Sequence, residues 1–122
     1  MRAGDTFLFP GADDHLWTII SDPEADPRRV VIVLFVSHTE KYDQACVLSG
    51  GEHPFIKRPT CVQYPGARVV TDALLESLRL AGRLRPREPL SPELLAMIRK
   101  RAENADIRTG AYEILREQGF VP

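Results

Sequence analysis

The chain has 122 residues, 43% of them hydrophobic and 27% charged, a balance typical of one globular domain and unlike that of a disordered chain. Its net charge of −1 excludes a uniformly basic protein, so a nucleic-acid partner would need a local basic patch. The longest apolar run, from Val30 to Val36, is far too short to cross a bilayer. Because no apolar signal segment follows Met1, we expect a cytoplasmic protein without a membrane partner.

Short runs of β-branched and aromatic residues, separated by turn signals, fill the first 71 residues. The strongest is Val30–Ser37, whose nearly unbroken apolar character predicts a strand buried on both faces. A Pro-Gly pair at 65–66 predicts a turn between two late strands. Several short strands with turns between them predict a small half-open barrel. The remaining predicted strands cover residues 6–10, 16–21, 45–48, 61–64 and 68–70.

The pattern changes to helical spacing after residue 71. Leucines predict a helix over 72–80, with Asp72 as its N-cap and Gly82 as its end. Residues 83–89 read as a basic linker that contains proline. The pair Ser91-Pro92 predicts the start of a second helix that runs to about residue 104. A third helix is expected over about 108–118.

We therefore predict a mainly β fold with C-terminal helices, in which the whole chain forms a single domain. Residues 1–71 would form the barrel core and residues 72–122 the helical part, with two or three helices.

Two cysteines, Cys46 and Cys61, lie in apolar, strand-like sequence, and we expect both to be buried free thiols. A zinc site made with His38 and His53 is the alternative, but these four residues include no tight pair such as Cys-x-x-Cys. The glycine pair after Ser49 lacks the Lys-Ser/Thr of a phosphate-binding loop. We therefore expect no metal and no cofactor.

The residues best suited to acid–base chemistry are the three histidines, because imidazole exchanges protons near neutral pH. His15, His38 and His53 all fall at predicted strand ends or in loops, and the strand ends of a small barrel meet at one rim. A histidine that only bonds to backbone in a turn is the alternative for His53. Basic and aromatic residues that could bind phosphates or stack on a base are Lys41, Lys57, Arg58, Arg68 and Tyr64.

Five segments occur in the order found in the PemK/MazF family of bacterial toxins. Residues 4–9, Gly-Asp-Thr-Phe-Leu-Phe, resemble its first strand, and residues 15–21 take the place of its second. Residues 31–39 resemble its central strand, which ends in a Thr/Ser segment, and residues 60–71 its late strand pair with an Arg. Leu90-Ser-Pro-Glu resembles the opening of its C-terminal helix. The resemblance extends to about residue 104 and implies an SH3-like barrel.

The resemblance also implies a function: a homodimeric toxin that cleaves single-stranded RNA without a metal and is inhibited by an antitoxin protein. It matches Thr39 in position to the family's catalytic Thr/Ser. The family's Arg-Arg-Pro before the second strand, which supplies a main catalytic Arg, is absent here, and His15 is the nearest residue. The expected catalytic residues are therefore His53, His38, His15, Thr39 and Arg58, and the expected RNA-binding residues are Lys41, Lys57, Arg68 and Tyr64.

Two other functions fit the same sequence. A non-catalytic SH3-like module would contact a protein or a nucleic acid through Trp17, Tyr64 and the basic residues. An interaction protein would dock a partner helix on its C-terminal helices, although an apolar stripe such as Leu94, Leu95 and Ile98 usually faces a protein core.

Overall fold

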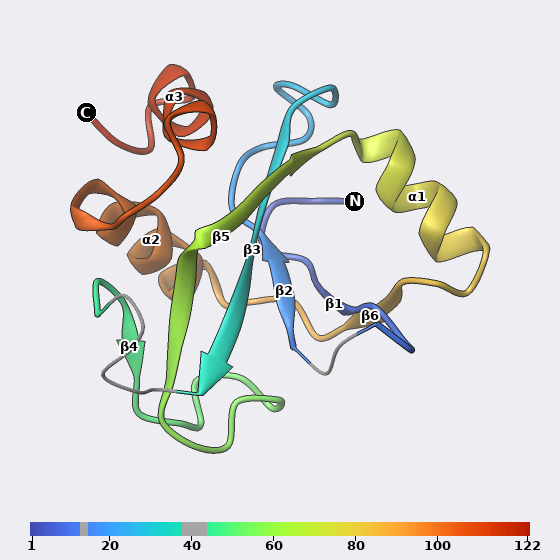
Figure 1. Ribbon diagram of the computed structural model, residues 1–122, viewed down its shortest axis with the longest axis horizontal. Helices are drawn as coiled ribbons and strands as arrows, with labels where there is room; N and C mark the ends of the chain where they lie inside the picture. The colour runs from blue at the N-terminus through green and yellow to red at the C-terminus, as the bar shows by residue number, and fades with distance from the viewer. Residues whose placement is uncertain (13–14, 38–43) are drawn as a thin grey trace.

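The computed structural model describes residues 1–12, 15–37 and 44–122. These residues form one antiparallel sheet with helices on both of its sides (Figure 1). The elements in chain order are β1 (Thr6–Leu8), β2 (Trp17–Ile19), β3 (Val30–Ser37), β4 (Val47–Leu48), β5 (Thr60–Val70), α1 (Asp72–Leu80), β6 (Arg85–Arg87), α2 (Pro92–Arg101), the 3-10 helix η1 (Ala102–Asn104) and α3 (Thr109–Glu117).

The six strands lie in the order β4-β5-β3-β2-β1-β6, and every neighbouring pair is antiparallel. Within the described residues no pairing joins β4 to β6, so the sheet has two open edges. The prediction of a mainly β fold with C-terminal helices is confirmed. The closure expected of a barrel is not seen in this sheet.

β3 is the central strand and is buried on both faces, as its apolar sequence predicts. Val31, Val33 and Phe35 face the larger core, which also contains residues of α2 and α3. Val30 and Ile32 face a smaller core that contains residues of β1, β2 and α1. Because side chains alternate along a strand, β3 needs apolar residues at every buried position to serve both cores.

The prediction of two late strands with a Pro-Gly turn is wrong, because β5 is one strand of 11 residues. Its pairing with β3 shifts at Pro65-Gly66: Gln63 lies opposite Leu34, whereas Arg68 lies opposite Ile32. The extra β5 residues form an irregularity that bends the strand without ending it. Gly66 has no side chain at this bend, where a Cβ atom would lie 2.7 Å from Cδ2 of Leu34.

The expected linker 83–89 contains a strand, β6, that sequence patterns do not reveal. β6 is three residues long and exposed, and it pairs with β1 at the edge of the sheet. Pro86 lacks the N–H that a central strand needs, and an edge strand tolerates this loss. The hydroxyl of Thr6 on β1 donates a hydrogen bond to the carbonyl oxygen of Glu88, 2.7 Å away, and so extends the contact beyond β6.

The three expected helices are present, but the predicted N-cap of the first helix is wrong. Thr71, rather than Asp72, is the N-cap of α1, and its hydroxyl accepts a hydrogen bond from the Leu74 amide at 3.0 Å. Asp72 instead forms an ion pair with the N-terminal amine at 3.0 Å. Ser91 caps α2 as predicted, with Pro92 at the first helical position.

Both cysteines are buried free thiols, as predicted. In the part of the chain that the structure describes, no helix has the length and apolar character needed to cross a membrane.

Candidate functional site

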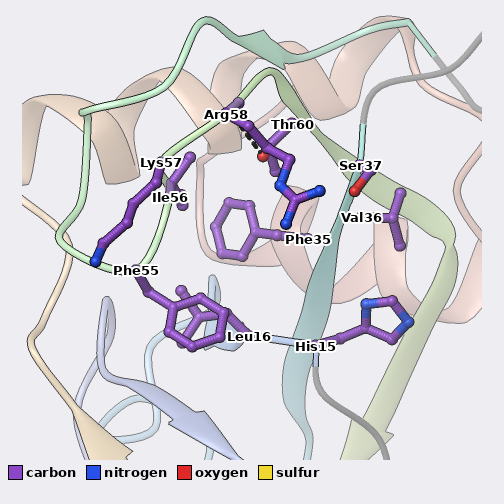
Figure 2. Close-up of a pocket in the computed structure, with 10 residues that line it drawn as sticks. All are labelled: His15, Leu16, Phe35, Val36, Ser37, Phe55, Ile56, Lys57, Arg58 and Thr60. Carbon is purple, nitrogen blue, oxygen red and sulfur yellow. Dashed lines mark hydrogen bonds between the residues drawn. The ribbon is translucent and has the colours of Figure 1, made fainter.

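A cavity of about 410 Å³ opens where β3 ends, between the start of β2 and the loop of residues 49–59 (Figure 2). Two of the predicted catalytic residues, His15 and Arg58, line this cavity, together with Lys57. We call it the His15–Arg58 pocket. Its other lining residues are Leu16, Phe35, Val36, Ser37, Phe55, Ile56 and Thr60.

Backbone hydrogen bonds of β2 and β3 hold His15 at the rim of the pocket. The next residue, Leu16, is buried, and its carbonyl oxygen accepts a hydrogen bond from the Phe35 amide at 2.9 Å. This bond fixes the backbone beside His15, while the imidazole itself is exposed. In Figure 2 the Arg58 side chain extends from the loop toward the Phe35 ring, and the His15 imidazole lies below and to the right of it.

The loop of residues 49–59 presents Lys57 and Arg58 through a set of backbone bonds. The Glu52 carboxylate accepts hydrogen bonds from the amides of Ser49 and Gly50, at 2.9 and 2.7 Å. Gly50 has a φ of 113°, and a Cβ atom there would lie 3.1 Å from the Arg58 backbone nitrogen. The close approach that glycine permits therefore packs the two arms of this loop against each other.

The pocket concentrates positive charge, although the chain as a whole has a net charge of −1. Its described lining includes the cations Lys57 and Arg58 and the imidazole of His15, and it includes no carboxylate. The hydroxyls of Ser37 and Thr60 add polar groups, and the Thr60 hydroxyl donates to the Arg58 carbonyl oxygen at 2.8 Å. Such a pocket suits an anionic ligand, because arginine and lysine bind phosphate oxygens directly.

Aromatic side chains lie beside these cations. Phe35 is buried under the pocket, whereas Phe55 on the loop is 40% exposed. Sequence reasoning did not single out Phe55. The available signal was its place directly before Ile56-Lys57-Arg58, since an exposed aromatic residue next to basic residues is typical of single-stranded nucleic-acid sites. Ser37 and Thr60 gave no comparable signal.

His53 does not line the His15–Arg58 pocket. It is buried, its Nε2 bonds the Glu88 carbonyl oxygen, and its Nδ1 accepts a hydrogen bond from the Phe55 amide at 3.0 Å. Since a carbonyl can only accept, these partners assign the proton of the neutral ring to Nε2. Both nitrogens bond to backbone, which fits the alternative of a turn histidine.

Two of the predicted RNA-binding residues lie away from this pocket. Tyr64 is fully buried, and its hydroxyl donates to the Ile98 carbonyl oxygen at 2.7 Å, so a base cannot reach its ring in this structure. Arg68 lies on the other side of the sheet, with its guanidinium carbon 5.7 Å from the centre of the Trp17 ring. Of the described candidates, the His15–Arg58 pocket therefore brings together only His15, Lys57 and Arg58.

Three of the predicted site residues, His38, Thr39 and Lys41, lie outside the described residues. Among residues 1–12, 15–37 and 44–122, no group of three or more His, Cys, Asp or Glu side chains is arranged to hold a metal ion.

Comparisons with protein-family models, with curated proteins and with solved structures gave no significant match to this chain. The PemK/MazF resemblance therefore rests on the sequence segments alone.

Proposed function

We propose that this chain is a PemK/MazF-like endoribonuclease that cleaves single-stranded RNA without a metal, and that the His15–Arg58 pocket is its active site. The observation that carries the proposal is that one imidazole and two cations line the same pocket, whose described lining has no carboxylate. RNA fits such a pocket because each of its linkages has an anionic phosphate that the cations can bind. The ribose beside that phosphate has a 2′-hydroxyl, which is the nucleophile that the imidazole can deprotonate.

In the proposed reaction the His15 imidazole accepts the proton of the 2′-hydroxyl. The 2′-oxygen then forms a bond to phosphorus, and the bond from phosphorus to the 5′-oxygen breaks. The products are a 2′,3′-cyclic phosphate and a 5′-hydroxyl. Because attack is in line, the leaving 5′-oxygen lies opposite the base and takes its proton from a second group, for which the Lys57 ammonium is the described candidate.

Arg58 has the electrostatic role in this proposal. Its guanidinium would donate to the non-bridging phosphate oxygens, where negative charge grows in the phosphorane transition state. The hydrogen bond from Thr60 to the Arg58 carbonyl oxygen, and the contact with Gly50, fix the backbone from which this side chain extends. Arg58 would thus take the place of the catalytic arginine that the family's Arg-Arg-Pro motif supplies and that this chain lacks before its second strand.

The wider proposal follows the resemblance. We propose that the sheet is a divergent SH3-like barrel, that the protein acts as the toxin of a toxin–antitoxin pair, and that it forms a homodimer. The long bent strand β5, which pairs with both β3 and β4, supports the barrel part of this proposal.

A second candidate function is non-catalytic binding of single-stranded nucleic acid in the same pocket. It is favoured by one observation: His15 is the only imidazole in the described lining, since His53 bonds to backbone elsewhere. Binding needs the cations and Phe55 but no proton transfer, so the two functions separate in a cleavage assay.

The test incubates purified protein and chelator with a labelled single-stranded RNA that contains all sixteen dinucleotide steps. We expect cleavage that yields 2′,3′-cyclic phosphate ends, that stops when the cut nucleotide is 2′-deoxy, and that falls by at least about a hundredfold in His15→Ala. Arg58→Ala should lose about as much, and Arg58→Lys less. Arg28→Ala, which removes an exposed arginine outside the pocket, is the matched control.

RNA that stays intact but binds in the pocket would overturn the enzyme and support the binding module. RNA that neither binds nor is cut would overturn both.

A further inference from the structure

A second cavity, of about 510 Å³, lies next to the His15–Arg58 pocket and shares two side chains with it. It is lined by His53, Pro54, Phe55, Lys57, Arg87 and Glu88. Phe55 and Lys57 line both cavities, so the exposed Phe55 ring stands between them. The volume of the second cavity falls in the range of small-molecule sites, which is about 300–1,000 Å³.

Phe55 has the surroundings of a base-stacking side chain. Its ring is 40% exposed, and the Arg87 guanidinium carbon lies 5.8 Å from the ring centre. Arg87 comes from β6, and of these two cavities it lines only the second, whereas Arg58 lines only the first. Each of the two cavities that Phe55 lines therefore contains its own arginine, with Lys57 common to both. Alternation of aromatic and cationic groups is how proteins follow a single strand of nucleic acid.

The second cavity is held in shape by hydrogen bonds across it. His53 bonds the Glu88 carbonyl oxygen through Nε2 and accepts from the Phe55 amide through Nδ1. The His53 carbonyl oxygen accepts in turn from the Ile56 amide at 2.9 Å. Phe55 and the backbone beside Arg87 are therefore fixed relative to each other before any ligand binds, which lowers the entropic cost of binding.

We infer that this second cavity is a nucleotide subsite next to the cleavage site. The base of a nucleotide that neighbours the scissile phosphate would stack on Phe55, and its own phosphate would lie between Lys57 and Arg87. Glu88 is the one acidic residue in the described lining of this cavity, against two cations. The inference rests on the proposed function, because it assigns the ligand as a continuation of the same single-stranded RNA.

The test measures binding of 2′-O-methyl oligouridylates of two and of five nucleotides, which lack the 2′-hydroxyl proton and resist cleavage. We expect Phe55→Leu to weaken binding of both oligonucleotides, because the dinucleotide already contains the base that would stack on the ring. Arg87→Gln should weaken binding of the pentanucleotide about tenfold, with a smaller effect on the dinucleotide, which has no second internucleotide phosphate. Arg87→Gln should also lower the slope of log affinity against log salt by about 0.7, the value for one phosphate contact on a single strand. A side chain that only supports the fold would not change this slope.

Arg85→Gln is the matched control, because Arg85 is an exposed arginine of the same strand that lines neither cavity. An equal loss for both oligonucleotides in Arg87→Gln, an unchanged salt slope in that variant, or the same loss in Arg85→Gln would each overturn the subsite. These results are independent of cleavage. If wild-type protein cuts RNA while Arg87→Gln binds the pentanucleotide normally, the subsite fails and the enzyme stands. If length-dependent binding is lost in Arg87→Gln but no RNA is cut, the subsite stands and the enzyme fails.

Discussion

The Nε2 atom of His53 and the carbonyl oxygen of Glu88 are joined by a hydrogen bond that ties the loop of residues 49–59 to the end of β6. The Thr6 hydroxyl donates to the same oxygen at 2.7 Å. β1, β6 and the loop therefore meet at one backbone atom. Because Phe55, Lys57 and Arg58 all lie on this loop, the bond connects the stability of the sheet edge to the geometry of the proposed site.

Replacing His53 should destabilise the folded protein. His53→Ala removes the partner of the Phe55 amide and one of the two donors to the Glu88 carbonyl, and we expect the free energy of unfolding to fall by about 1–3 kcal/mol. His53→Gln can still donate to Glu88 and should lose less. Urea denaturation followed by circular dichroism measures both changes.

The matched control for His53 is His15→Ala, since His15 is an exposed histidine at the pocket rim. Its free energy of unfolding should stay within about 0.5 kcal/mol of the wild type. Equal stabilities of His53→Ala and wild type would contradict the structural role given to His53.

Gly50→Ala should disturb the loop at the point where it approaches Arg58. A Cβ atom at residue 50 would lie 3.1 Å from the Arg58 backbone nitrogen, in a conformation with φ of 113° that side chains rarely adopt. We expect a loss of about 1–3 kcal/mol in the free energy of unfolding, together with weaker RNA binding because Arg58 is displaced.

Gly110→Ala provides the contrast in the same denaturation experiment. Gly110 lies in α3, and apart from its chain neighbours and its own helix backbone no atom lies within 4 Å of its Cβ position, so alanine should stabilise the helix by about 0.4–1 kcal/mol. A Gly50→Ala protein as stable as the wild type would show that the loop does not need the glycine conformation.

The thiol of Cys46 should make folding sensitive to alkaline pH. Burial raises the pKa of Cys46 above its ordinary value of 9.0, and this effect outweighs the opposing charge of Arg101. The folded protein then keeps the thiol neutral at pH values where the unfolded chain ionises. Stability from this group is complete below the unfolded pKa and is lost as the pH rises through the folded pKa.

The measurement is the free energy of unfolding of wild type and Cys46→Ala at several pH values above 9.0. We expect the wild type to lose up to about 1.4 kcal/mol per pH unit more than the variant. Parallel pH profiles would show that the buried thiol does not contribute.

The parts of the fold that could be predicted are those in which local sequence and final packing agree. Val30–Ser37 is apolar almost throughout because both of its faces are buried, and Ser91-Pro92 starts a helix by capping chemistry alone. β6 could not be predicted, since three exposed residues around Pro86 become a strand only when β1 lies beside them. The single strand β5 was missed because Pro65-Gly66 is usually a turn signal.

For the site, the sequence predicts which types of residue take part but not which of them lie together. Sequence identified His15 and Arg58 as candidates, but it could not show that they share a cavity, because that depends on where β2, β3 and the loop end in space. It could not show that Tyr64 bonds Ile98 in the core, because a tyrosine in a strand can face either way. The role of His53 could not be decided either, because its bond to the Glu88 carbonyl depends on where the end of β6 lies in space.

The most direct test of the central claim is a nuclear magnetic resonance titration of isotope-labelled protein with an uncleavable 2′-O-methyl pentanucleotide. The account predicts that the largest shifts fall on the His15 imidazole and on the amides of Phe55, Lys57 and Arg58, which line the His15–Arg58 pocket. Shifts confined to the groove of Trp17 and Arg68 on the other side of the sheet, with the His15–Arg58 pocket unaffected, would contradict it.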